Sequence, residues 1–75
     1  MYQEYLEKII NEEKELHKKW RKLTMFIGSD QYMELDFCQR KMLIEQQTFM
    51  WGYIEVLRRR IKYEKSLKGD TDGDK

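Results

Sequence analysis

The sequence predicts an all-α protein, an antiparallel hairpin of two long helices that assembles into a compact homo-oligomer. Apolar residues recur at alternating steps of three and four in two long segments, which is the spacing of one helix face. A single break, Gly28–Asp30, separates these segments. Neither segment alternates with the period of two that a strand would show. The chain has 75 residues, so it forms at most one domain.

The first helix is expected at about residues 2–27. Its apolar stripe is interrupted only by Glu13. The stripe consists of Tyr2, Leu6, Ile9, Leu16, Trp20, Leu23 and Ile27.

A turn is expected at residues 28–38, either as a simple turn or with an extra helical turn inside it. Gly28 is a typical helix-stop residue, and Ser29 and Asp30 are residue types that favour helix N-caps.

The second helix is expected at about residues 39–66, and its stripe is interrupted by Gln46. Residues 1–68 would then form the hairpin domain, and the acidic residues 69–75 a disordered tail. In an antiparallel hairpin the expected facing pairs are Tyr2–Ile61, Leu6–Leu57, Ile9–Tyr53, Glu13–Met50, Leu16–Gln46 and Trp20–Leu43.

The chain holds more apolar residues than one seam between two helices can bury. A soluble monomer rarely exposes so large an apolar surface, and a two-helix hairpin is marginally stable alone. We therefore expect a homo-oligomer. The residues expected at its interface are Phe26, Phe49, Trp51 and Ile54.

The composition excludes several classes of protein. One cysteine permits no internal disulfide, and with one histidine it cannot form a tetrahedral zinc site, so neither a metal nor a cofactor is expected. A net charge of +1 argues against a binder of long nucleic acid. No segment is apolar enough to span a membrane, and the N-terminus does not resemble a signal peptide. These features favour a reducing cytoplasm.

No catalytic constellation is apparent, so an enzyme is not expected. His17 lies at helical spacing from Glu13 and Arg21, which is typical of a solvated helix face. Cys38 is expected to be a small packed residue. The polar breaks of the two stripes have two open interpretations: Glu13 and Gln46 either set the register of the seam or border a polar cavity.

The cationic side chains are the best candidates for binding an anion. Arg59 is at the right spacing to pair with Glu55, whereas Arg60 flanks the seam. The facing pattern also places Tyr5 near Arg58. Arginine forks suit phosphate and tyrosine rings can stack on a base, so both ends of the hairpin could contribute to one ligand site.

The runs "YQEYLEKIINEEKEL", "KKWRKLTMFIGSDQYMEL" and "LIEQQTFMWGYIEVLRRRI" carry a further signal. They resemble the helical-hairpin family of phage anti-defence sponges, which includes anti-CBASS and anti-Thoeris proteins and many proteins of crAss-like phages. The resemblance covers residues 2 to about 62. Its most specific positions are Phe26–Ile27 with Ser29, Met50 with Tyr53, and Arg60–Ile61.

The resemblance implies a non-enzymatic homohexamer in the host bacterial cytoplasm. Such proteins bind cyclic di- or trinucleotide immune signals between subunits and thereby block CBASS-type effectors. The implied ligand residues, together with those derived above, are Tyr5, Lys19, Lys22, Tyr53, Arg58 and Arg60. The family often has arginine where this chain has Tyr5, which leaves the preferred ligand open.

Two other functions remain compatible with the sequence. The hairpin could be a structural or adaptor protein that binds a protein partner through a methionine-rich face. The basic segment Arg58–Lys68 could instead bind nucleic acid weakly, with an affinity that falls steeply as salt rises.

Overall fold

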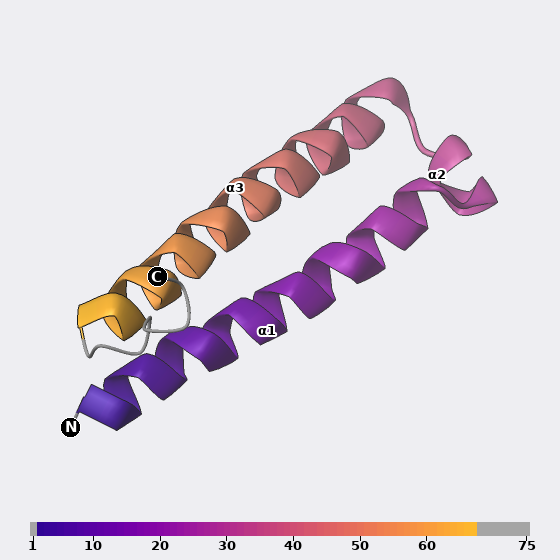
Figure 1. The fold of residues 1–75 in the computed structure, drawn as a ribbon. Helices are drawn as coiled ribbons and strands as arrows, with labels where there is room; N and C mark the ends of the chain where they lie inside the picture. The colour runs from indigo at the N-terminus through magenta and orange to yellow at the C-terminus, as the bar shows by residue number, and fades with distance from the viewer. Residues whose placement is uncertain (1, 68–75) are drawn as a thin grey trace.

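The computed structural model describes residues 2–67, and every element in this range is helical. The elements are α1 (Tyr2–Ile27), α2 (Asp30–Met33) and α3 (Phe37–Leu67). The two long helices run antiparallel and side by side, and α2 lies at the closed end of the hairpin (Figure 1). The all-α fold class is confirmed, whereas assembly into an oligomer stays a prediction. The tail expected at 69–75 lies outside the described residues.

The inward face of α1 is the stripe expected from its sequence. Leu6 and Ile9 are buried, and the remaining members of the stripe are half-buried. Steps of three and four residues keep side chains on one side of a helix, so this face can pack against α3 along its whole length.

The connection between the long helices is built around the end of α1. The Ser29 hydroxyl donates a hydrogen bond of 2.6 Å to the Phe26 carbonyl, and the Gly28 amide donates one of 3.2 Å to the Thr24 carbonyl. These bonds satisfy carbonyls that the last turn of a helix leaves without a partner. Ser29 is also the residue before α2, but its hydroxyl serves α1 instead of capping α2.

The start of α3 is fixed by a reciprocal capping box. The Gln39 amide donates to the Asp36 carboxylate at 2.8 Å, and the Asp36 amide donates to the Gln39 side-chain oxygen at 3.0 Å. This arrangement satisfies two amides at a helix N-terminus. Accordingly α3 begins at Phe37, two residues before the expected start, and the pattern Asp-x-x-Gln was the signal for it.

The inward face of α3 differs from the expected stripe at alternate positions. Ile54 and Leu57 have 0% exposed surface, whereas Tyr53 is 44% exposed. Counting from Leu43, the alternating steps of three and four can be taken in either order. Taking three first gives the expected Gln46 and Tyr53, whereas taking four first gives Gln47 and Ile54, which is the face observed. The observed face buries the apolar Ile54 and leaves the hydroxyl of Tyr53 at the surface, where it need not lose its hydrogen bonds.

Two of the residues expected at the interface between subunits therefore belong to the hairpin itself. The expectation for Ile54 is wrong, because this residue is fully buried in the seam. Trp51 is half-buried, and its ring lies 4.7 Å from that of Trp20, measured between centroids. In contrast, Phe49 is 74% exposed, and Phe26 is half-buried with its ring perpendicular to that of Tyr32.

The long side chains that meet across the seam are offset from the expected pairs. Tyr5 is hydrogen-bonded to Arg60, where the facing pattern placed it near Arg58, and the Tyr53 hydroxyl is hydrogen-bonded to Glu12, three residues beyond its expected partner Ile9. Side chains of an α-helix lean toward its own N-terminus. In an antiparallel pair, two long side chains that touch therefore belong to residues with higher numbers, in both helices, than the residues whose backbones face each other.

Candidate functional site

One edge of the seam carries three of the predicted ligand residues, Tyr5, Tyr53 and Arg60. Nη2 of Arg60 donates a hydrogen bond of 3.3 Å to the Tyr5 hydroxyl. On the same edge, the Tyr53 hydroxyl donates to the Glu12 carboxylate, and the Tyr2 hydroxyl donates to the Glu64 carbonyl. The Arg60 guanidinium, three phenol rings and the Glu12 carboxylate thus line this edge, which we call the Arg60 edge.

Beside this edge lies a surface hollow of about 300 Å³, formed by one end of α3. Arg59 and Arg60 bring two positive charges to it, Glu64 brings one negative charge, and Tyr63 adds an aromatic ring. The fifth residue of its lining is Val56. The hollow therefore has a net positive charge and a flat ring beside it, which suits an anion that carries a planar group.

The surroundings of Arg60 favour its charged form and raise its pKa. The hydrogen bond with Tyr5 is the largest cause that raises the pKa of Arg60, and the nearby carboxylates of Glu12 and Glu64 raise it further. The guanidinium is therefore a permanent cation at any physiological pH.

Arg58 lies on the opposite edge of the seam. Its Nε donates to the Glu13 carboxylate at 2.9 Å, and its guanidinium carbon lies 5.3 Å from the Trp51 ring centroid. Successive residues of an α-helix are rotated by about 100°, so Arg58 and Arg60 point to opposite sides. The expected proximity of Arg58 to Tyr5 is therefore wrong.

Lys19 and Lys22 are exposed on α1, far from Tyr5. At a rise of about 1.5 Å per residue, they lie about 21 to 26 Å from Tyr5 along the helix axis. One hairpin therefore cannot bring these lysines and the Arg60 edge to the same small ligand.

Arg59 and Tyr63 were not among the expected ligand residues. The spacing of four residues predicted that Arg59 pairs with Glu55, but the Glu55 carboxylate accepts a hydrogen bond of 3.2 Å from the Trp51 indole. Tyr63 lies one helical turn beyond Arg59 and Arg60, and this spacing was the available signal.

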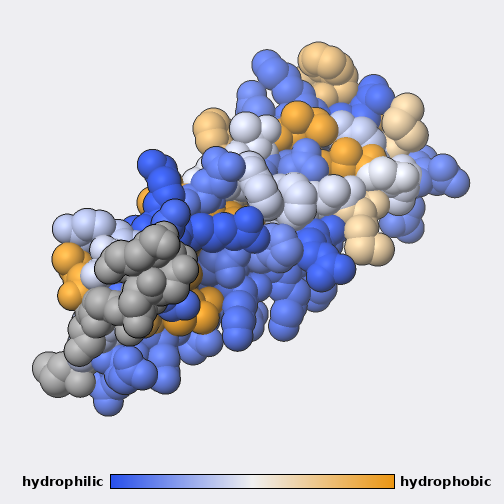
Figure 2. Space-filling view, viewed as in Figure 1, coloured by the Kyte–Doolittle hydropathy of each residue, from blue (hydrophilic) through white to orange (hydrophobic). Residues whose placement is uncertain are grey.

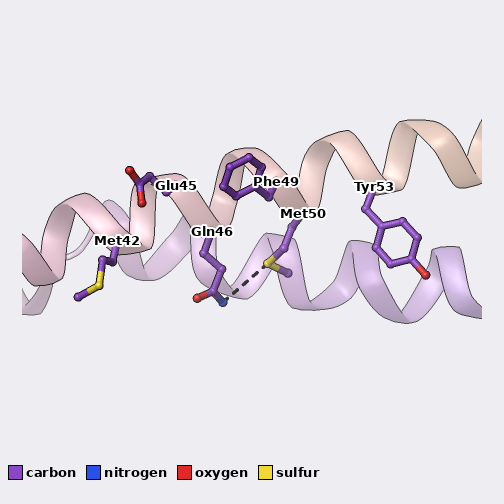
Figure 3. A pocket seen from close by; sticks show the side chains of 6 residues that line it. All are labelled: Met42, Glu45, Gln46, Phe49, Met50 and Tyr53. Atoms are coloured by element: carbon purple, nitrogen blue, oxygen red, sulfur yellow. Dashed lines mark hydrogen bonds between the residues drawn. The ribbon is translucent and has the colours of Figure 1, made fainter.

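The polar interruptions of the two stripes have different surroundings. The Glu13 side chain is only 16% exposed and is paired with Arg58, which agrees with a role in the seam. Gln46 is exposed and lines a second hollow, of about 450 Å³, to which α3 alone contributes (Figure 3). Its side-chain amide lies 3.9 Å from the Met50 sulfur. The other residues around this hollow are Met42, Glu45, Phe49 and Tyr53.

The structure also places His17 and Cys38, the other two side chains considered for chemistry. His17 stacks on Trp20, with ring centroids 5.8 Å apart, and Cys38 is a free cysteine that is exposed instead of packed. Within residues 2–67, no group of three or more histidine, cysteine, aspartate or glutamate side chains is arranged to hold a metal ion.

The comparison with known families identifies the chain. A family model described as Sequestin matches residues 3–63, which is most of the chain. The chain belongs to the Sequestin family. This membership confirms the resemblance to the helical-hairpin sponges that the sequence indicated. The match covers α1 from its second residue and α3 as far as Tyr63, and it includes Tyr5, Glu12, Tyr53 and Arg60 of the Arg60 edge.

Among curated proteins and among solved structures, none matches this chain. A search of the described helices for a segment able to cross a membrane gave none of the required length and apolarity. The family membership and the geometry of the Arg60 edge are therefore the basis for a functional proposal.

Proposed function

We propose that this Sequestin family member sequesters cyclic di- or trinucleotide immune signals in the cytoplasm of a phage-infected bacterium and does not cleave them. The observation that carries the proposal is the hydrogen-bonded pair of Tyr5 and Arg60 beside a positively charged hollow. Membership of a family described as Sequestin supports a sequestering role.

The chemistry of these ligands matches the groups on the Arg60 edge. A cyclic dinucleotide carries two phosphates and two bases in one compact ring. The Arg60 guanidinium can bind a phosphate through two parallel hydrogen bonds, and Tyr5 holds it in place through the existing bond. The exposed rings of Tyr53 and Tyr63 offer faces on which a base can stack.

Binding at this edge requires no chemical step, so we propose a protein that is not an enzyme. Sequestration needs enough protein to take up the ligand and an affinity that competes with that of the defence effector. A ligand that remains intact in the complex keeps the effector inactive.

The predicted lysines fit the proposal only in an assembly. Lys19 and Lys22 can reach a ligand at the Arg60 edge when they belong to another copy of the chain. We therefore propose a site between subunits of a homo-oligomer, with a hexamer as the expected form.

The second hollow favours one alternative, an adaptor that binds a protein partner. Met42 and Phe49 are exposed there, and methionine-rich apolar surfaces suit many peptide partners. This function does not involve Arg60 or Tyr5, so the two proposals differ in the ligand that they require.

A thermal unfolding panel separates them. The melting temperature is measured with cyclic dinucleotides, cyclic trinucleotides, and linear dinucleotides as the control for charge. A ligand that binds only the folded state raises the melting temperature in proportion to the logarithm of its concentration. We expect a rise with at least one cyclic member and a smaller one with its linear counterpart. Melting temperatures that no cyclic nucleotide changes would reject sequestration and favour the adaptor.

A further inference from the structure

The Arg60 edge carries a carboxylate, which is an unexpected group beside a site for an anion. Glu12 is exposed on α1 and accepts a hydrogen bond from the Tyr53 hydroxyl. After the Tyr5 hydrogen bond, its charge is one of the causes that raise the pKa of Arg60. A negative charge at this place repels a phosphate. If Glu12 contacts the ligand, it therefore contacts a different part of it, one that donates hydrogen bonds.

Two contacts between the helices follow each other along this edge. Tyr5 and Glu12 are seven residues apart on α1, and their partners Arg60 and Tyr53 are seven residues apart on α3. Seven residues make about two helical turns, so the two contacts lie on the same side of the seam and about 10.5 Å apart along it. One contact offers donors to a phosphate, and the other offers a carboxylate. A nucleotide has its phosphate at one end and its base at the other, so it can bridge this gap.

Between the two contacts, α3 presents an apolar side chain. Val56 is 40% exposed, and it lies three residues after Tyr53 and four before Arg60. This spacing keeps the three residues on one side of α3. Apolar and hydrophilic side chains are likewise intermixed on the face of the hairpin that Figure 2 shows. A flat base can lie against Val56 and the Tyr53 ring while its polar edge reaches Glu12.

The hydrogen-bonding capacity of Glu12 discriminates between the bases. Within residues 2–67 its only hydrogen-bond partner is the Tyr53 hydroxyl, and an ionised carboxylate can accept several bonds but donates none. Guanine presents two neighbouring donors on its Watson–Crick edge, the N1–H and the 2-amino group. Adenine and cytosine present an acceptor beside their amino group, and uracil presents one N–H between two carbonyls. A carboxylate that faces an acceptor is repelled, so this group favours guanine.

We propose that Glu12 binds the Watson–Crick edge of a guanine while Arg60 and Tyr5 bind a phosphate of the same ligand, so that this protein selects cyclic nucleotides that contain guanine. The inference rests on the proposed function and adds to it the base that the site requires. Glu12 is then a specificity-determining residue, and Tyr53 holds its carboxylate in place through the existing hydrogen bond. A contact of two parallel hydrogen bonds to a base typically discriminates against the wrong base by about ten- to hundred-fold in affinity.

Calorimetry with three matched ligands tests the preference. The ligands are cyclic nucleotides of one ring size that carry only guanine, only hypoxanthine or only adenine. Hypoxanthine keeps the N1–H of guanine and lacks its 2-amino group. We expect the guanine ligand to bind about ten- to hundred-fold more tightly than the adenine ligand, with the hypoxanthine ligand between them. Equal affinities, or a preference for adenine, would overturn this inference and leave sequestration intact. If none of the ligands bound at either ring size, the proposed function would fail together with the inference.

Glu12→Gln separates contact with the base from an effect on Arg60. A side-chain amide accepts a hydrogen bond from the 6-amino group of adenine and donates one to its N1, so the variant should lose the preference for guanine and bind the adenine ligand more tightly than the wild type does. Glu64→Gln is the matched control, because it removes another carboxylate whose charge acts on Arg60. It should change the affinity for all three ligands by the same factor. The same uniform change in Glu12→Gln would show that Glu12 acts only through charge or through Tyr53, and the proposal would be wrong.

Discussion

Arg58 and Arg60 are identical side chains two residues apart, yet the hairpin gives them different partners. Arg58 is paired with Glu13 and lies against Trp51. Among residues 2–67, Arg60 forms no ion pair with a carboxylate, and its Nη2 donates a hydrogen bond to the Tyr5 hydroxyl. A guanidinium already paired with a carboxylate is a poor phosphate receptor, so Arg60 is the residue to remove first.

Arg60→Ala should weaken binding of the cyclic nucleotide by about 1.5–3 kcal/mol, roughly ten- to hundred-fold, which is typical for a hydrogen bond to a charged group. Isothermal titration calorimetry measures this loss. Arg58→Ala is the matched control: it should leave affinity unchanged while lowering stability, because Glu13 loses its partner. A larger loss of affinity in Arg58→Ala than in Arg60→Ala would place the site on the other edge.

Ile54 is one of two residues of the seam with no exposed surface, and it packs between the two long helices. Ile54→Val should lower the free energy of unfolding by about 0.5–1.5 kcal/mol, and Ile54→Ala by about 2–5 kcal/mol, since each leaves a void. Urea unfolding followed by circular dichroism measures both. Ile44→Ala on the exposed side of α3 is the control and should cost less than half as much as Ile54→Ala. Equal losses would mean that Ile54 is not in a packed core.

At the scale of the elements, much of the hairpin follows from its sequence, and the exceptions have physical causes. The stripe of α1 was predictable because it has a single consistent spacing. The stripe of α3 had two equivalent spacings, and only packing against α1 decides between Tyr53 and Ile54. Arg60 and Tyr5 were predictable as candidates, but their contact depends on how side chains lean along each helix.

The capping box at Asp36 and Gln39 predicts a measurable effect on α3. Asp36→Ala should lower the free energy of unfolding by about 0.5–2 kcal/mol, as for other N-cap replacements. Gln39→Ala should cost less, and the double variant should cost less than the sum because the two bonds form together. Asp30→Ala in α2 is a control without a capping bond to lose. Strict additivity in urea unfolding would contradict a cooperative box.

At the scale of the whole molecule, the predicted ligand residues are spread over a greater length than one small ligand can span. Lys22 lies about 26 Å along α1 from Tyr5, yet both are predicted ligand residues. Lys22→Ala should therefore reduce affinity in the assembled protein, whereas Lys14→Ala, another exposed lysine of α1, should not. Calorimetry on both variants gives the comparison. An affinity unaffected by Lys22→Ala would restrict the site to the Arg60 edge.

Recovery of the bound ligand tests the central claim, sequestration without cleavage, most directly. The protein is mixed with a slight deficit of the cyclic nucleotide that gives the largest thermal shift. After a prolonged incubation, ultrafiltration separates free from bound ligand, and heating then releases the bound fraction for chromatography. We expect a filtrate depleted of ligand and quantitative recovery of the intact cyclic nucleotide after heating. A linear or cleaved product would contradict the central claim by making the protein an enzyme, and a filtrate that still contains all the ligand would contradict sequestration itself.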